Sequence, residues 1–281
     1  MVRTRTSYGM HRIARLVATL LALFFAGAGA CQHVTGPAPG IPYRRVLFVG
    51  NSLTAVNALP SMVSAVASRA AASMYVESVT GGGLALIDHL TGSTDAAQRI
   101  RHGHFDLIVL QQGPTPRGLC RDSLVLWSQM FAQLAHQAHA DVALLMTWPA
   151  RGASESAFDD VRVSFQQAAY ETRGVFLPVG EAWRELMTLD ATLEPYGPDG
   201  FHPSPMGTYL AALTIVERLI GIDIREVSLA PPAIGIPLLN GTTLGSLQRA
   251  AHAANARFPT HPDQSAANPT PPGATLPGGH C

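Results

Sequence analysis

Two short segments hold the side chains whose types and spacing could do covalent chemistry. Ser52 comes just after the apolar run 46–49, so its hydroxyl is expected at the end of a buried strand, where the chain turns into a helix. His202 follows Asp199 by three residues on a turn rich in Pro and Gly, which can place the carboxylate beside Nδ1 and leave Nε2 facing a hydroxyl. Ser52, His202 and Asp199 are therefore predicted to be a nucleophile, its base and the acid that orients the base.

The elements that must position these side chains alternate between short β-rich runs and longer helical runs. This alternation is typical of βαβ units and of a parallel sheet covered on both faces. The predicted strands are 45–49, 75–79, 107–110, 142–147 and 175–178, and the predicted helices are 59–72, 95–101, 123–138, 155–172 and 180–187. Ser204 and Pro205 are the N-cap and first position of a further helix to about residue 220, which would hold the His202 turn in place.

The two ends of the chain are predicted to lie outside this folded domain. Arginines precede the apolar run 16–26, which is too short to span a bilayer comfortably, so residues 1–30 are predicted to be an export signal peptide. The segment Ala28-Gly29-Ala30-Cys31 is similar to a bacterial lipobox, in which the cysteine is lipidated; a plain cleaved signal is the alternative. We expect a linker over 31–43, the domain over 44–222, an extension with one helix (243–256) over 223–258, and a disordered Pro/Gly-rich tail over 259–281.

Composition argues against several classes of partner and site. Nineteen basic and nineteen acidic residues give zero net charge, and no Lys/Arg stripe is interleaved with aromatics, so nucleic-acid binding is not expected. The three cysteines have no CxxC spacing and no nearby His pair, so we predict neither a zinc site nor a disulfide framework. We expect no other metal and no organic cofactor.

The segment from residue 44 to 220 resembles the SGNH or GDSL-type hydrolases, which cleave carboxylic esters on a flavodoxin-like, three-layer α/β/α sandwich. Gly50-Asn51-Ser52-Leu53 matches the first block of this family, written GDS or GNS, and Asp199 and His202 match its last block, DxxH. The resemblance implies a central parallel five-stranded sheet. It also implies that Ser52 is the nucleophile and that its own backbone N–H is one oxyanion donor.

The two middle blocks of the family are matched less completely. The second is a glycine whose backbone N–H reaches the oxyanion, and of Gly81-Gly82-Gly83 we favour Gly83. The third, Gly-x-Asn-Asp in most of the family, is replaced by Leu110-Gln111-Gln112, as in a bacterial branch that carries Leu-Gln-Gln or Leu-Gln-Glu. A Gln amide can donate to an oxyanion as Asn does, but its extra methylene demands a different backbone position, so Gln111 and Gln112 are both candidates.

Three other residues near these blocks have two interpretations each. Asp88 and His89 follow the glycine run and either face the pocket or lie on a surface helix turn. Trp148 ends the fourth predicted strand and either forms a wall of the acyl pocket or packs in the core.

The resemblance implies an exported serine esterase, anchored to the bacterial cell envelope by a lipid on Cys31 or else secreted or periplasmic. Expected substrates are O-acetyl groups on carbohydrates, or short-chain esters. The alternative from another class is a non-catalytic glycan-binding lipoprotein that keeps the same sheet. That alternative predicts that Ser52 and His202 do not meet.

Overall fold

A sheet of five parallel strands, in the order β2-β1-β3-β4-β5, forms the centre of the domain. The computed structural model describes residues 43–115, 118–229 and 240–263. The strands are β1 (Arg45–Gly50), β2 (Tyr75–Thr80), β3 (Leu107–Leu110), β4 (Asp141–Leu145) and β5 (Val175–Leu177). In β1, Val46 pairs with Val76 of β2 and Leu107 of β3, so this strand is hydrogen-bonded on both sides. The predicted parallel five-stranded sheet is confirmed.

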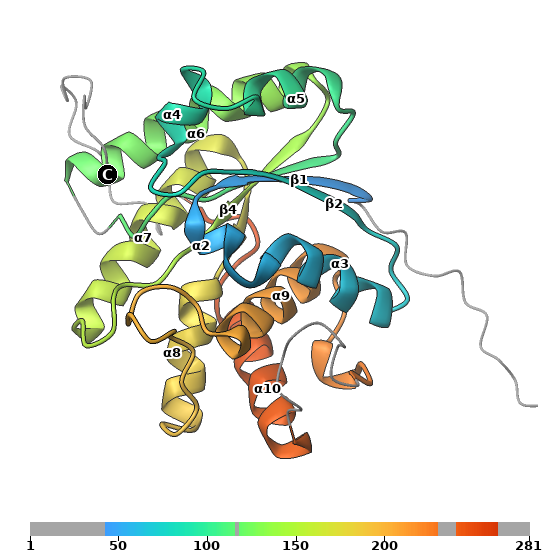
Figure 1. Cartoon of the computed structure of the whole chain (residues 1–281), viewed down its shortest axis with the longest axis vertical. Coiled ribbons are helices and arrows are strands. Elements are labelled where there is room, and N and C mark those ends of the chain that lie inside the picture. Colours follow the sequence, from blue (N-terminus) through green and yellow to red (C-terminus); the bar gives the residue numbers. More distant parts are fainter. Residues whose placement is uncertain (1–42, 116–117, 230–239, 264–281) are drawn as a thin grey trace, which may run out of the picture. The chain divides into compact units, whose positions relative to one another are not determined.

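Helices cover both faces of this sheet (Figure 1). One face carries α3 (Leu59–Arg69), α8 (Val179–Leu189), α9 (Pro205–Ile220) and α10 (Gly241–Arg257), and the other carries α4 (Leu86–Leu90), α5 (Ala96–His102), α6 (Leu119–Gln137) and α7 (Glu155–Thr172). Successive residues of β1 enter opposite cores: Val46 and Phe48 face the first, Leu47 and Val49 the second. This is why the strand is apolar throughout, and it confirms the three-layer α/β/α class.

The strand order creates a switch point between β1 and β3. From β1 the chain moves to β2 on one side, and from β3 it moves to β4 on the other. Ligands of open parallel sheets bind outside the carboxyl ends of strands at such a point. Ser52 follows β1 and Gln111 follows β3, so both lie at this switch point.

Helix α9 begins and ends as its sequence predicts. The Ser204 hydroxyl accepts a hydrogen bond from the backbone N–H of Gly207 (3.1 Å), and Pro205 occupies the first helical position. Gly221, with φ +68°, ends the helix in a left-handed conformation that glycine adopts at no steric cost. The cap holds His202 two residues before a buried helix.

The C-terminal part of the described chain belongs to the same core rather than to an extension. Helix α10 buries Leu247, Ala250 and Ala251 in the cluster that includes α8 and α9. Beyond it, the carbonyl of Thr260 accepts a hydrogen bond from Phe176 N of β5 (2.8 Å). The predicted onset of disorder at residue 259 is therefore several residues too early, because the edge of β5 binds this segment. Residues 264–281 lie outside the described residues.

Predictions about the N-terminus also fall outside the described residues, which begin at Tyr43. This applies to the signal peptide 1–30, the lipidation site Cys31 and the linker. Within the described ranges, no helix combines the length and apolar character needed to cross a membrane. Cys120 is disulfide-bonded. The prediction of no disulfide framework is wrong in respect of Cys120, because cysteine spacing alone carries no signal of this bond.

Candidate active site

Ser52 lies at the point where β1 turns into the short helix α2 (Ser52–Ala55). Asn51 directs the turn, since its side-chain oxygen accepts from Leu53 N (3.1 Å) and its backbone carbonyl accepts from Thr54 N (3.0 Å). Gly50 is required here because a Cβ at this position would lie 2.4 Å from Gln111 Oε1. The half-buried Ser52 is thus held at the carboxyl end of a buried strand.

The loop that leads into α9 brings His202 and Asp199 to Ser52. His202 Nε2 lies 2.9 Å from Ser52 Oγ, and His202 Nδ1 lies 2.5 Å from Asp199 Oδ2. Asp199 Oδ1 accepts from the backbone N–H groups of Phe201 and His202, both at 3.0 Å. The three residues singled out in the sequence therefore meet in one hydrogen-bonded chain, contrary to what the non-catalytic alternative predicts.

The charge of Asp199 fixes the proton positions in this chain of hydrogen bonds. The hydrogen bond from His202, together with those from the Phe201 and His202 backbone, lowers the pKa of Asp199 to about 2. An ionised carboxylate only accepts, so the imidazole proton sits on Nδ1 and Nε2 is the acceptor. Ser52 Oγ–H then donates to Nε2, which is the arrangement a general base needs.

The segment after β4 anchors the His202 loop. Trp148 Nε1 donates to the Phe201 carbonyl (2.9 Å), and the backbone N–H of Arg151 donates to the Gly200 carbonyl (2.8 Å). Trp148 is 1% exposed and stacks on Trp183, with ring centroids 3.6 Å apart. Of its two interpretations, core packing is therefore the correct one, and its indole N–H also positions the backbone next to His202.

A second contact joins the Ser52 side of the site to the His202 side. Asn57 lies in η1 (Val56–Ala58) with φ +55° and ψ +20°, a left-handed conformation that Asn tolerates better than most residues. Its Nδ2 donates to the Pro203 carbonyl (2.9 Å) and to Thr208 Oγ1 (3.0 Å). Sequence reasoning missed this residue, because no local pattern signals a contact with a loop so far along the chain.

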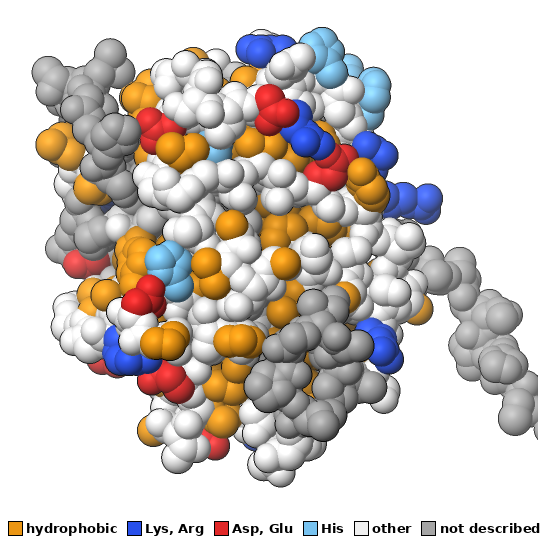
Figure 2. All heavy atoms as spheres, in the orientation of Figure 1, with side chains coloured by type: hydrophobic (Ala, Val, Ile, Leu, Met, Phe, Trp, Pro, Cys, Tyr) orange, Lys and Arg blue, Asp and Glu red, His pale blue; other side chains and the backbone are white. Residues whose placement is uncertain are grey.

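A cleft of about 620 Å³ opens beside the histidine and the aspartate. Its lining includes His202, Asp199 and Asn57, with Arg151 and Glu194 as charged groups. Arg151 Nε and Glu194 Oε2 lie 3.5 Å apart, so the cleft offers both a donor and an acceptor group. Figure 2 shows that acidic, basic and hydrophobic side chains are interspersed on the face in view.

The structure gives Gly83 a free backbone donor near the first block. Gly83 is exposed and has φ +72°, which favours glycine. Within the described part of the chain, neither its N–H nor that of Ser52 has a hydrogen-bond partner. The backbone N–H groups of Ser52 and Gly83 are therefore free to donate to an oxyanion, and this role stays a prediction.

The two glutamines have different contacts, although both are buried. Gln111 Oε1 accepts from Asn51 N and from Thr54 Oγ1, both at 2.8 Å, and Gln111 Nε2 donates to Asn51 Oδ1 (3.0 Å). Gln112 Oε1 accepts from Leu86 N (3.1 Å), whereas Gln112 Nε2 is buried with no partner among the described residues. The amide of Gln111 is thus used to hold the first block, and Gln112 retains a free amide nitrogen.

His89 fits neither of its two predicted positions. It is 1% exposed, so it lies neither on a surface turn nor in the open cleft. Its Nε2 is 3.1 Å from the Gly50 carbonyl and its Nδ1 is 2.9 Å from Thr94 Oγ1. Asp88 Oδ2 accepts from Ala85 N (2.7 Å) at the start of α4.

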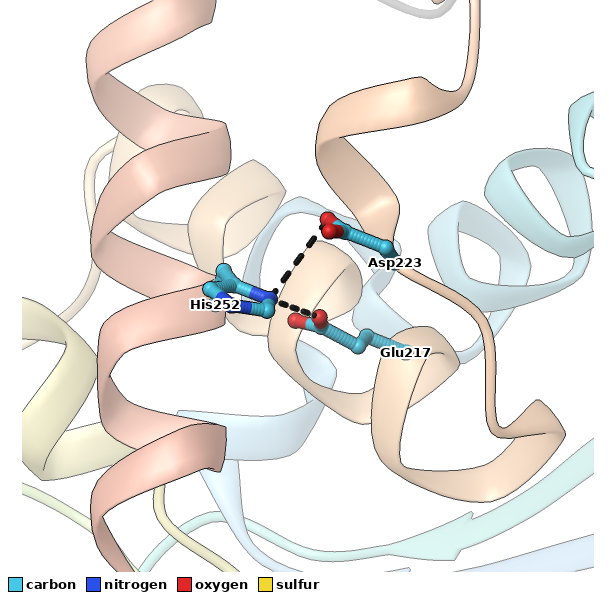
Figure 3. A group of neighbouring side chains, drawn as sticks. All are labelled: Glu217, Asp223 and His252. Carbon is cyan, nitrogen blue, oxygen red and sulfur yellow. Dashed lines mark hydrogen bonds and ion pairs between the residues drawn. The ribbon is translucent and has the colours of Figure 1, made fainter.

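A separate group of ionisable side chains lies where α9, η2 (Ile224–Glu226) and α10 meet (Figure 3). His252 Nδ1 is 2.7 Å from Glu217 Oε1 and 3.5 Å from Asp223 Oδ1. Asn255 Nδ2 donates to Glu217 Oε2 (3.0 Å), and hydrogen bonds from Arg225 hold the pKa of Asp223 well below its usual range. Each carboxylate has its own protein partner, so these contacts tie three elements together.

Comparison with known proteins rests on structure alone, because neither a family model nor a curated protein matches the chain. A DUF4886 family protein from Bacteroides uniformis matches with a TM-score of 0.64 and 18% identity, over 75% of this chain and 94% of that one. A proposed SGNH hydrolase from Slackia heliotrinireducens matches with a TM-score of 0.53 and 25% identity, over 62% and 97%. A proposed GDSL-like lipase from Parabacteroides merdae matches with a TM-score of 0.50 and 15% identity, over 63% and 95%.

These structures share the parallel sheet and helical layers described above. The structural similarity indicates the same fold as the two outer sequence blocks, which are Gly50-Asn51-Ser52-Leu53 and Asp199 to His202. The chain therefore has the SGNH/GDSL-type hydrolase fold.

Proposed function

We propose that the chain is a serine esterase that hydrolyses carboxylic esters through an acyl-enzyme. The observation that carries the proposal is the pair of short contacts that link Ser52 Oγ to His202 Nε2 (2.9 Å) and His202 Nδ1 to Asp199 Oδ2 (2.5 Å). Nucleophile, base and orienting acid are within hydrogen-bond reach and in the right order.

In the first half of the reaction, Ser52 Oγ attacks the ester carbonyl carbon while His202 Nε2 takes the hydroxyl proton. The tetrahedral intermediate collapses when the imidazolium returns this proton to the leaving alcohol, which departs with the electrons of the broken C–O bond. In the second half, His202 takes a proton from water, and the resulting hydroxide oxygen attacks the acyl carbon. The acid is released and Ser52 regains its proton.

The negative charge of each tetrahedral intermediate needs hydrogen-bond donors. Our candidates are the backbone N–H groups of Ser52 and Gly83 and the side-chain amide of Gln112. The contacts of the glutamines support Gln112 over Gln111, because Gln111 Nε2 already donates to Asn51 Oδ1. Loss of one oxyanion donor costs about 10²- to 10³-fold in kcat.

The substrate class we favour is a carbohydrate carrying O-acetyl or other short acyl groups. The cleft beside His202 is open, and Arg151, Glu194 and Asn57 offer both donors and acceptors along its wall, as a polyhydroxylated alcohol requires. Short-chain esters with a simpler alcohol are the second candidate. An exported location, with a lipid anchor on Cys31, would bring such an enzyme to cell-envelope or environmental glycans.

A non-catalytic glycan-binding lipoprotein is the competing proposal. It accounts for the cleft and for the altered third block, but gives no reason for a polarised hydroxyl at 2.9 Å from an imidazole nitrogen. The two proposals differ in turnover and not in binding, so a binding assay cannot separate them.

Hydrolysis of p-nitrophenyl acetate and butyrate tests the proposal. The wild type should turn over at least one of these esters, Ser52→Ala should not, and Ser61→Ala should match the wild type because Ser61 is exposed on α3. The ratio of the acetate rate to the butyrate rate then indicates how long an acyl chain the pocket accepts. Folded wild-type protein that hydrolyses neither these esters nor acetylated oligosaccharides would favour the binding protein.

A further inference from the structure

A buried histidine outside the Ser-His-Asp chain contacts the end of the nucleophile strand. His89 is in the short helix α4, is 1% exposed, and places Nε2 3.1 Å from the carbonyl oxygen of Gly50. Gly50 is two residues before Ser52. The other ring nitrogen, Nδ1, is 2.9 Å from the hydroxyl of Thr94.

The partners of His89 fix its tautomer. A carbonyl oxygen only accepts, so Nε2 must carry the proton that bonds Gly50. Nδ1 of the neutral ring then accepts from the Thr94 hydroxyl. Burial lowers the pKa of His89, which keeps the ring neutral and preserves this arrangement.

The Gly50 carbonyl joins two parts of the proposed site. Besides His89, it accepts from the backbone N–H of Gly81 (3.3 Å), which opens the loop that contains Gly83. Asn51 Nδ2 donates to the carbonyl of Leu84 (3.1 Å) at the other end of that loop. The nucleophile turn and the predicted oxyanion loop are therefore fastened to each other at two points.

The contact of His89 joins a closely packed strand end to a short helix. Gly50 has no space for a side chain of its own, because Gln111 Oε1 and Thr54 Oγ1 would lie 2.4 and 2.8 Å from a Cβ. Helix α4 has only five residues, so its own backbone holds its orientation weakly. The donor on His89 fastens the middle of α4 directly to β1, while the bond from Leu86 N to Gln112 Oε1 holds the start of the helix.

We propose that His89 is a positioning residue for the esterase site: its Nε2–H holds the Gly50 carbonyl, and thereby sets Ser52 and the Gly81–Gly83 loop relative to each other. This inference rests on the proposed function. In this role His89 neither contacts the substrate nor transfers a proton. Loss of its contact with Gly50 should therefore change kcat rather than KM.

Two amide substitutions separate the two ring nitrogens. In His89→Gln the side-chain nitrogen can occupy the place of Nε2 and donate to Gly50, whereas in His89→Asn it reaches only the place of Nδ1. We expect His89→Gln to keep kcat within about threefold of wild type, and His89→Asn to lose about 10- to 100-fold in kcat with KM nearly unchanged. Thr94→Val, which keeps the Gly50 bond, should behave like His89→Gln.

A measurement independent of activity checks the bond itself. In wild-type protein labelled with ¹⁵N at histidine, one of the 11 imidazoles should show the Nε2–H tautomer unchanged at about pH 7 and above, and this signal should vanish in His89→Gln. An Nδ1–H tautomer, or titration of His89 in this range, would overturn the inference.

The outcomes distinguish failure of this inference from failure of the proposed function. A wild type without turnover overturns the proposed function, and this inference with it. An active wild type with a folded His89→Asn of equal kcat overturns this inference alone. The same holds if His89→Asn and His89→Gln lose activity equally, because the amide at the Nε2 position would then make no difference.

Discussion

Asp199 controls the state of His202 through contacts that a sequence motif only suggests. Its Oδ1 accepts two backbone N–H groups and its Oδ2 takes the imidazole proton, which together lower its pKa to about 2. The side chain is 51% exposed, so hydrogen bonds rather than burial set its charge. Asp199 therefore stays ionised over the whole range in which an esterase would be assayed.

This charge state predicts the acid side of the pH profile. As the pH falls, kcat/KM should decrease with the uptake of a single proton, because His202 Nε2 must be unprotonated to accept from Ser52 while Asp199 protonates only near pH 2. Asp199→Asn should lower kcat by about 10²- to 10⁴-fold, since the neutral amide permits the wrong imidazole tautomer. A pH series of initial rates for both proteins measures this.

A decrease that takes up two protons would show that Asp199 titrates together with His202, which contradicts the assignment.

The lowered pKa of Asp199 also makes the free energy of unfolding depend on pH. Because it lies below the value of an unfolded aspartate, about 3.9, the contribution of Asp199 is present above about pH 4 and is lost as the pH falls toward 2.

The two glutamines should respond differently to the same substitution. Gln111→Leu leaves Asn51 N and Thr54 Oγ1 without their acceptor in a buried place, so it should lower the free energy of unfolding by about 1–3 kcal/mol. Gln112→Leu should lower kcat by about 10²-fold or more if its free Nε2 reaches the oxyanion. Urea unfolding and kcat measured on both variants give the comparison. Equal kcat for wild type and Gln112→Leu would remove Gln112 from the mechanism.

Sequence reasoning at this scale found the residues with a strong chemical signature and missed those that act through backbone groups. Ser52, Asp199 and His202 could be predicted because their order and spacing match the chemistry. Asn57 and His89 could not, because a lone Asn or His has no distinctive spacing and its partner lies far along the chain.

At the scale of elements, η1 and the His202 loop are joined by one side chain. Asn57 makes two hydrogen bonds to the start of α9 while its backbone holds φ +55°. The contact is a tether between the element that follows the nucleophile and the loop that carries the base. Loss of the Asn57 contact should let η1 and the His202 loop move apart without disturbing the sheet.

Substitution of Asn57 tests this tether. Asn57→Gly removes both hydrogen bonds and keeps the left-handed backbone, whereas Asn57→Ala also adds backbone strain of about 1 kcal/mol. We expect both variants to lose about tenfold in kcat, and Asn57→Ala to have the lower Tm of the two. If Asn57→Gly retains full kcat, the tether has no part in aligning Ser52 and His202.

The elements themselves were largely predictable. Strand 107–110 and helices 155–172 and 205–220 agree with the structure at both ends, because strong apolar periodicity and clear caps mark them. The bounds of the short helices α2 and α4 were not predicted, since four or five residues carry too little periodicity. Both are held by tertiary contacts to the switch point, which is information that a local pattern does not contain.

At the scale of the whole molecule, α10 and the segment behind it complete the core. Arg218 of α9 is largely buried, which lowers its pKa to about 10, and its guanidinium donates to the carbonyls of Asn255 and Phe258 and to Thr260 Oγ1. The sequence predicts an extension because the apolar pattern weakens after Ile224 into a stretch that contains Pro and Gly. The apolar stripe on α10 is short, but its residues pack with those of α8 and α9 in one core cluster.

Two truncations test whether this part is essential. A chain ending after Asp263 should keep the cooperative thermal unfolding of the full chain when both are measured in reducing agent, which removes the Cys120 disulfide from the comparison. A chain ending before Asn240 should lose that transition, because burial of Leu247 alone is worth about 1.5–3 kcal/mol and Arg218 would be left unpaired. A cooperative transition in the shorter chain would show that α10 is an extension that the core does not need.

Covalent labelling by a fluorophosphonate, followed by mass mapping, shows whether Ser52 is an activated nucleophile. We expect one adduct on wild-type protein, located on Ser52, and its loss in Ser52→Ala and in His202→Ala, because only a hydroxyl activated by His202 reacts. Ser61→Ala should label like the wild type. A folded wild type that takes up no label, or takes it up on another serine, would contradict a Ser52–His202–Asp199 esterase site.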